Sequence, residues 1–204
     1  MGIGNVSKLL AAWGVGGFVH AIPRYSLDAF PEATRGRVTG VVKPLDRRVL
    51  EAPVSGRLCV YHEIQILDVR DWIKVPLARE RRSVPFVLED ETGRAIVDPE
   101  HARVECDFDE RTFSKAAFDA DARQRALLDR FSLLERDWSK STGGIRYTEA
   151  VIALDETITL IGKGVREPDP EARPECDCGY REGGATRMRF TSCRKYPLVL
   201  GATS

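Results

Sequence analysis

The stretch EAPVSGRLCVYHEIQILDV (residues 51–69) joins a short Pro/Ser/Gly loop to a long alternating segment. Its even positions are Leu58, Val60, His62, Ile64 and Ile66. All of these except His62 are apolar, and alternation with period two is typical of a β-strand with one buried face. We therefore predict a strand over Arg57–Val69 that forms one wall of a β-sheet or a small barrel.

Cys59 and His62 are the first candidates for chemistry in this stretch. They are three positions apart, and on a regular strand such residues point to opposite faces, so we do not expect them to form a pair. His20 or His101 would have to approach Cys59 through the fold, and no pattern in the sequence indicates this. We expect Cys59 to be a packing residue and His62 a hydrogen-bonded structural group, and we predict no catalytic residue.

Further strands surround this stretch. Gly36–Lys43 is rich in Val and Thr and ends before Pro44. Val84–Glu89 and Arg94–Asp98 flank a turn in which we expect Gly93 to supply a positive φ. Additional strands are expected at 102–108, 147–153, 157–165, 186–190 and 197–200. Many short strands with frequent turns favour a mainly β fold of the α+β class, a small barrel or sandwich.

The pattern changes from strand to helix spacing between residues 110 and 138. Eight residues follow one another at alternating intervals of four and three: Phe113, Ala117, Ala120, Gln124, Leu127, Phe131, Leu134 and Trp138. Only Gln124 interrupts this apolar stripe. The spacing predicts one long amphipathic helix of roughly 25 residues, a helical insertion over 110–138 whose stripe packs against the barrel.

Charge and composition limit the classes of function. The 204 residues are 43% hydrophobic and 30% charged, as in a soluble globular domain, and 31 Lys and Arg balance 31 Asp and Glu. This balance argues against non-specific nucleic-acid binding as the main role. Basic residues are nevertheless in excess over 35–82, a region that contains Tyr61, Trp72 and Arg79–Arg82. A small barrel that binds single-stranded nucleic acid therefore stays an alternative.

The first 27 residues are predicted to be separate from the domain formed by 28–204. Residues 9–22 are apolar apart from His20, which is too short for a transmembrane helix of about 20 residues. We interpret residues 1–22 as a docking segment, with a membrane-surface anchor or a leader peptide as alternatives. The predicted location is the cytoplasm, with membrane association as the alternative.

The cysteines do not form a recognisable metal site. They lie at positions 59, 106, 176, 178 and 193, and an odd number at irregular spacing favours a reducing compartment. Cys176, Cys178 and Cys193 could supply three thiolates, but a structural zinc site needs four ligands, usually from two CxxC pairs. Phosphate-loop, GxSxG and HExxH motifs are absent from the sequence. We predict no metal site and no cofactor.

Taken in order, these segments resemble the GIDE (or BAM) domain of the membrane-bound mitochondrial ubiquitin ligase and its bacterial relatives. The similar segments are Gly36–Val42, the loop Ala52–Gly56, Cys59–Tyr61, Trp72, PFVLEDETGRAIVDPEHARVE (85–105), RYTEAVIALDETITLIGKGV (146–165), YRE (180–182) and PLVL (197–200). The resemblance extends over about residues 28–201.

This resemblance implies an oligonucleotide-binding-like β-barrel elaborated with helices. Ligase members of the family also carry transmembrane helices on both sides of this domain and a zinc-binding RING. The present sequence has no second apolar span and no Cys/His array of a RING. The expected function is therefore a non-catalytic module that binds a protein partner, and the alternative is a ligase-related protein that acts with a separate catalytic chain.

Overall fold

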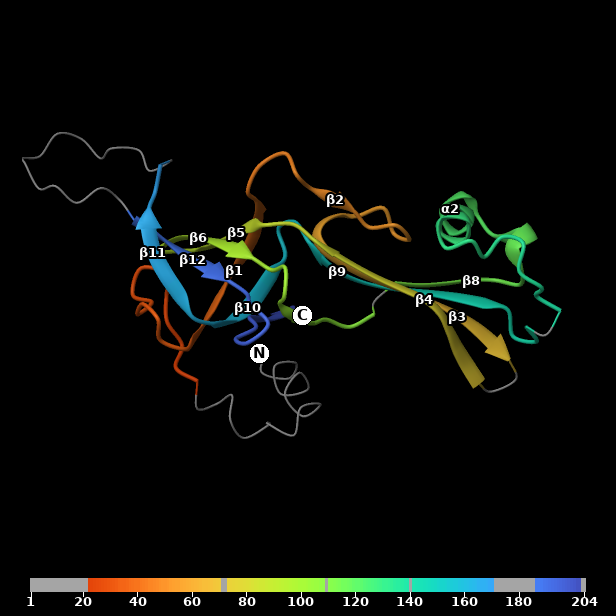
Figure 1. Ribbon diagram of the computed structural model, residues 1–204. Helices are drawn as coiled ribbons and strands as arrows, with labels where there is room; N and C mark the ends of the chain where they lie inside the picture. Colours follow the sequence, from red (N-terminus) through yellow and green to blue (C-terminus); the bar gives the residue numbers. More distant parts are fainter. Residues whose placement is uncertain (1–21, 71–72, 109, 140, 171–185, 203–204) are drawn as a thin grey trace, which may run out of the picture. The chain divides into compact units, whose positions relative to one another are not determined.

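The computed structural model describes residues 22–70, 73–108, 110–139, 141–170 and 186–202. These residues form a mainly β structure with one α-helix (Figure 1). They divide into two compact units: unit 1 lies within 1–48, 84–105 and 154–204, and unit 2 comprises 49–83 and 106–153. The sequence patterns did not predict this division of the region 28–204.

Unit 1 contains a curled sheet of eight strands. Their order across the sheet is β11-β12-β6-β5-β1-β10-β13-β7, and only the pairs β12–β6 and β13–β7 are parallel. The strands are β1 (Gly36–Pro44), β5 (Phe86–Asp90), β6 (Gly93–Asp98), β7 (Arg103–Glu105), β10 (Thr157–Gly162), β11 (Gly164–Pro168), β12 (Thr186–Thr191) and β13 (Val199–Ala202). The predicted strands at the chain's C-terminal end are thereby confirmed.

Strand β1 follows the predicted alternation. Its even residues from Gly36 to Val42 are buried, while the odd residues up to Lys43 are half-buried. Gly40 is required for packing, since a Cβ there would lie 2.5 Å from the carbonyl oxygen of Glu89 on the neighbouring strand. One face of β1 therefore contributes to the core, and the other is left for a surface feature.

The predicted β5–β6 hairpin is confirmed, but Gly93 does not supply a positive φ. The Oδ1 atom of Asp90 accepts hydrogen bonds from the backbone N–H groups of Thr92 and Gly93, at 2.8 and 3.0 Å. A side chain that satisfies these donors closes the turn without a left-handed residue. Asp90 therefore holds the turn together.

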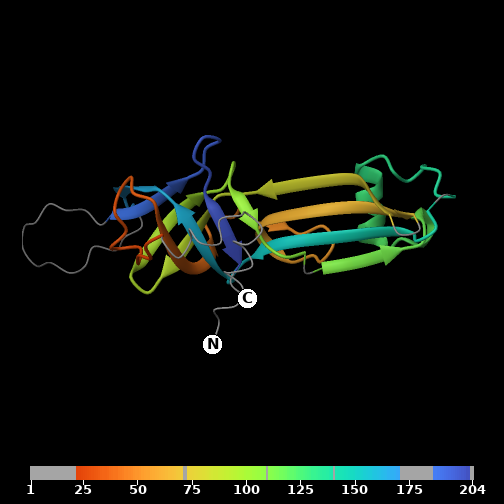
Figure 2. The same ribbon diagram turned by 90° about the horizontal axis from the view of Figure 1, so that it is seen from below.

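Unit 2 is built around the predicted long strand, which runs as β3 from Leu58 to Arg70. Its other strands are β2 (Leu50–Glu51), β4 (Ile73–Ser83), β8 (Glu110–Ser114) and β9 (Ile145–Ala153), and all pairs are antiparallel. β3 pairs with β2 and β4 along one edge and with β9 along the other, and β8 follows β9 (Figure 2). Leu58, expected in the core, is 58% exposed at the start of the strand.

The prediction of one long helix over 110–138 is wrong. Residues 110–114 form β8, Ala117–Asp119 form a 3₁₀ turn (η1), and the only described α-helix, α2, is Ala122–Arg130. Asp121 caps α2, since its side chain accepts the N–H of Gln124 while Gln124 Oε1 accepts the N–H of Asp121. Ser132, at φ 54°, ends the helical path. These local signals outweigh the apolar spacing.

The predicted apolar stripe nevertheless reaches the core in part. Leu127 and Leu128 of α2 pack against Ile64 and Ile66 of β3. Phe131, Leu134 and Trp138 join the same cluster from irregular structure rather than from a helix. Phe113 does not join it: this residue lies on β8 and is 53% exposed.

The two successive strands expected within 147–153 and 157–165 are present as β9 and β10. They are not paired with each other, because β9 belongs to the sheet of unit 2 and β10 to that of unit 1. Asp155, between them, has φ 63°.

Of the N-terminal segment, residues 1–21 lie outside the described part of the chain. Within that described part, none of the helices has the length and apolar character to span a membrane.

The left-handed conformation at Gly144 gives a test of the fold. Gly144 has φ +74°, and a Cβ there would lie 2.5 Å from the carbonyl oxygen of Ser114. We expect Gly144→Ala to lower the free energy of unfolding by about 1–3 kcal/mol through strain and this contact. Gly93→Ala is the control, since its Cβ would meet nothing closer than 3.9 Å. Urea unfolding of both variants checks this, and equal midpoints would contradict the assignment.

Candidate functional site

The register of β3 against β9 decides how Cys59 and His62 lie. Cys59 pairs with Ala153 and His62 with Val151, but the register shifts by one residue between Cys59 and Tyr61. Residues 151 and 153 point to the same face of β9, so their partners Cys59 and His62 also share a face. The predicted opposite orientation is wrong, because the bulge at Val60 breaks the period of two.

Sharing a face does not make these two residues a catalytic pair. Cys59 is 0% exposed and packs against Ala52 and Val151. Burial, with a smaller contribution from the negative charge of Glu149, raises the pKa of the Cys59 thiol to about 12, so the thiol stays protonated. This is a packing cysteine, as the sequence predicts.

His62 is a neutral core residue. It is 2% exposed, and burial lowers the pKa of its imidazole from the ordinary value of 6.5. Its Nδ1 has no hydrogen-bond partner among the described residues, so the expected hydrogen-bonded role is not met at this atom. Of the other histidines, His101 is exposed in unit 1 and His20 lies outside the described residues.

Glu149 is the functional group of this region that the sequence analysis missed. It is 0% exposed, and its two carboxylate oxygens accept the backbone N–H groups of Val54 and Ser55 at 2.7 and 2.9 Å. Gly56 completes the loop with φ +76° and donates its N–H to the carbonyl of Ala52. The Ala52–Gly56 loop is thus fixed to β9 by a buried carboxylate. A charged residue inside the apolar run of β9 was the signal available in the sequence.

A cavity of about 300 Å³ lies between this loop and α2. Its lining comprises Glu51, Ala52, Pro53, Arg123, Ala126, Leu127 and Arg130. Arg123 forms an ion pair with Glu51 at 2.8 Å and also packs over Gly56. The residues that line the cavity include no nucleophile and no titratable base other than Glu51. We therefore interpret it as a gap in the packing of α2 against the loop.

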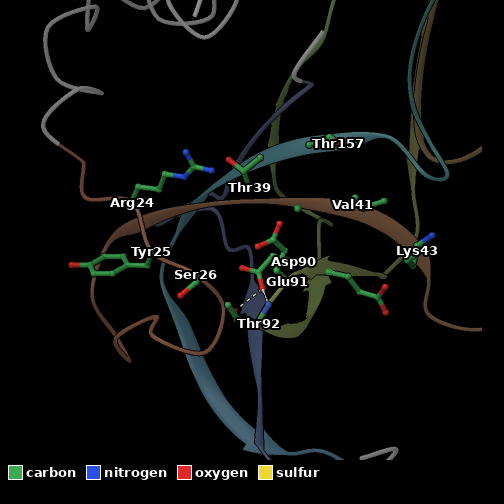
Figure 3. A pocket seen from close by; sticks show the side chains of 12 residues that line it. Arg24, Tyr25, Ser26, Thr39, Val41, Lys43, Asp90, Glu91, Thr92 and Thr157 are labelled. Atoms are coloured by element: carbon green, nitrogen blue, oxygen red, sulfur yellow. Dashed lines mark hydrogen bonds between the residues drawn. The ribbon is translucent and has the colours of Figure 1, made fainter. Parts of the chain in front are cut away.

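A larger, open cavity of about 820 Å³ lies in unit 1 (Figure 3). Residues 24–26 form one wall, the β5–β6 turn forms another, and the odd residues of β1 form the floor. The lining comprises Arg24, Tyr25, Ser26, Thr39, Gly40, Val41, Lys43, Glu89, Asp90, Glu91, Thr92 and Thr157. Cationic, anionic, hydroxyl and apolar groups all face this space, which suits binding better than a single reaction.

Hydrogen bonds hold the walls of this cavity in place. Asp90 Oδ2 accepts the N–H of Leu27 at 2.8 Å, which joins the turn to the segment after residue 26. Lys43 forms an ion pair with Asp155 at 2.5 Å, and this contact raises the pKa of its amine. Glu91 lies beside Asp90 (Figure 3), and Glu89 also lines the cavity. Asp90 therefore builds the wall, while its acidic neighbours face the open space.

The described residues include no group of three or more His, Cys, Asp or Glu side chains arranged to hold a metal. Cys176 and Cys178 lie outside this part of the chain. Cys193 is exposed, and its Sγ accepts the N–H of Tyr196 at 3.3 Å. The prediction about these three thiols therefore stays a prediction.

The buried carboxylate of Glu149 gives a second test. Glu149→Gln places an amide N–H₂ against one of the two backbone donors, and we expect the free energy of unfolding to fall by about 2 kcal/mol or more. Glu135→Gln is the matched control on an exposed site. Chemical unfolding measures both, and a Glu149 variant as stable as the control would show that the loop does not depend on this group.

The environments of the cysteines predict their reactivity. We expect an aromatic disulfide reagent at about pH 8 to label exposed Cys193 in the native protein but to spare Cys59 until unfolding, because only a thiolate reacts. Peptide mass spectrometry identifies the labelled positions. Native labelling of Cys59 at the rate of Cys193 would mean that the thiol is accessible and ionised.

Comparison with known proteins adds the family. A family model described as GIDE, E3 ubiquitin ligase, matches residues 73–175, half of the chain. The match includes the hairpin within 85–105 and the strands within 146–165, whereas the loop Ala52–Gly56 precedes it. No curated protein and no solved structure matches the chain. The chain belongs to the GIDE family, whose domain is associated with E3 ubiquitin ligases.

Proposed function

We propose that this chain is a non-catalytic interaction module that binds an extended segment of a partner protein in the open cavity of unit 1. The observation that carries the proposal is the cavity itself, about 820 Å³ and lined by groups of every polarity. An elongated peptide with mixed side chains could use such a lining, and binding needs no reacting group.

The chemistry of the cavity suggests how a peptide would be held. Thr39 and Thr157 offer hydroxyl groups on the floor, and Tyr25 and Val41 offer apolar surface beside them. Glu89 and Glu91 of the lining would accept hydrogen bonds from a lysine or arginine of the partner. β1 is paired on both edges, with β5 and β10, so a peptide would lie across its face rather than extend the sheet.

The wall formed by residues 24–26 is preorganised by contacts within unit 1. The backbone N–H of Tyr25 donates to the carbonyl of Arg37, and Arg37 donates in turn to Pro23, each at 2.9 Å. The ring of Phe30 packs edge-on between those of Tyr25 and Phe190, with centroids 5.4 and 4.9 Å apart. A wall that is ordered before binding lowers the entropy cost of association.

The family description, E3 ubiquitin ligase, supports a role for this module in connection with ubiquitin transfer. None of the residues that line the cavity is a cysteine or a histidine, the side chains that would carry or activate an acyl group. We therefore propose that any transfer step in which this module takes part is performed by a separate catalytic chain, and that the cavity contributes partner selection.

Blocking the cavity floor tests the proposal. Peptides selected from a random library for binding to the whole chain should bind Val41→Arg at least about tenfold more weakly, because the new side chain fills the space and must compete for it. Val165→Arg is the matched control: it adds the same side chain at a 54% exposed valine of the same unit. Fluorescence anisotropy with the selected peptides measures both affinities.

Two binding results would contradict the proposal. If selected peptides bind Val41→Arg as tightly as the parent chain, the cavity is not the binding site. If no peptide is enriched at all, peptide recognition is not the role of this unit. Circular dichroism of each variant verifies that the fold is intact before affinities are compared.

A further inference from the structure

The sheet of unit 2 has one face covered by α2 and a second face with a different character. On β8, Thr112 accepts a hydrogen bond from Gln124 of α2, so Thr112 lies on the helix side. Its neighbours Arg111 and Phe113 therefore point to the opposite face. On β4, Glu80 pairs with Arg130 of α2 at 2.9 Å, which places Arg79 and Arg81 on that opposite face as well.

Strand register adds the remaining members of this surface. Arg146 is opposite both Leu67 and Phe113, and Lys74 is opposite Val69. We call the surface the basic face, and its charged members are Lys74, Arg79, Arg81, Arg111, Arg146 and Glu63. Figure 1 shows α2 and its flanking segments on the other side of this sheet. Of the described side chains on the basic face, five are cationic and one is anionic.

The helix side, unlike the basic face, carries acidic and basic side chains together. Asp68 is buried there between Arg70 and Arg136, and Glu149 binds its loop. Strand alternation thus gives the basic face a cationic excess of its own. The zero net charge of the chain hides this local excess, so the zero net charge is no evidence against nucleic-acid binding by the basic face.

Glu63 organises two of the arginines. Its Oε1 accepts from Arg79 Nε at 2.7 Å and its Oε2 from Arg81 Nε at 2.5 Å. Burial opposes ionisation of Glu63, but the hydrogen bonds from Gln65 and the arginines outweigh it and lower the pKa of the carboxyl. The arginine side chains remain 54% and 53% exposed. They are therefore held in place while part of each guanidinium stays open to solvent.

Of the other cationic members, Lys74 and Arg111 are exposed and Arg146 is half-buried. Among the described side chains, Lys74, Arg111 and Arg146 have no ion-pair partner. Phe113, 53% exposed, stands beside Arg146, and the hydrogen-bonding side chains of Gln65 and Thr148 lie between Arg79 and Arg111. Adjacent strands are about 4.8 Å apart, so Arg79 on β4 and Arg111 on β8 are separated by about 14 Å across the sheet.

We propose that the basic face binds single-stranded nucleic acid. Guanidinium groups match phosphate oxygens in a bidentate geometry, and a strand that crosses the sheet would meet cations at both edges. The exposed ring of Phe113 offers a surface on which a base can stack, a contact that an acidic peptide would not use in this way. A lipid surface would be expected to meet several protruding apolar side chains, and this face presents one.

Removing two cations on β8 and β9 is the first test. Arg111→Gln combined with Arg146→Gln should weaken binding of a labelled oligothymidine about tenfold at low salt, measured by anisotropy. The slope of log affinity against log salt should also fall by about 1.4, since each phosphate contact to a single strand contributes about 0.7. The control is Lys115→Gln with Arg125→Gln, the same charge change at exposed residues of the helix side.

The aromatic residue gives a second, independent readout. Phe113→Ala should weaken binding about tenfold with an unchanged salt slope, because stacking releases no counterions. Phe113→Tyr should restore it. Phe118→Ala is the matched control, since Phe118 is 79% exposed on the helix side and should be without effect.

Three results would overturn the proposal. The first is no anisotropy change with the parent chain up to about 100 µM protein, a range that covers non-specific binding. The second is equal loss in the Arg111/Arg146 variant and its control. The third is tighter binding to polyglutamate or to vesicles containing phosphatidylserine than to oligothymidine, with the same variants reducing it. That outcome would assign the face to an acidic protein or to a membrane instead.

Discussion

The hydrogen bonding of β3 along both edges is the constraint on which unit 2 depends. Because β4 and β9 occupy the two edges, β3 can neither slip nor twist independently, and each of its residues is assigned to one face. Ile64 and Ile66 then receive α2, while Glu63 receives the arginines of β4. One strand therefore separates the apolar core beneath α2 from the basic face.

Sequence patterns predicted most strands because alternating apolar residues, β-branched residues and turn signals all favour strands. β1 alternates in burial up to Lys43, whereas β3 is buried on both faces over Cys59–Ile64, and each strand of the β5–β6 hairpin has three consecutive buried residues. The helix over 110–138 was overpredicted for a related reason: apolar residues at helical spacing can reach one core from a strand, a short helix and an irregular segment in succession. Capping by Asp121 and the turn at Ser132 decide the actual boundaries. The spacing of apolar residues gives no information about such local hydrogen bonds.

The candidate sites were less predictable than the strands. The bulge at Val60 places Cys59 and His62 on the same face of the sheet. The hydrophobic pattern of the sequence does not reveal a single extra residue of this kind. The cavity of unit 1 joins segments around Tyr25, Thr39 and Glu91, which only the sheet order brings together. The alternating pattern alone would indicate that Glu63 is a solvated residue of a strand. In the structure it is buried and accepts hydrogen bonds from two arginines.

The division of the chain between the two units has a consequence for biosynthesis. The chain passes from one unit to the other four times, so in the sequence every segment of unit 2 is preceded and followed by a segment of unit 1. On the ribosome, every residue of unit 2 has emerged once Ala153 is free, whereas β1 still lacks its partner β10. Unit 2 can thus acquire its structure first, and the early strands of unit 1 must wait with one edge unpaired until the C-terminal strands arrive.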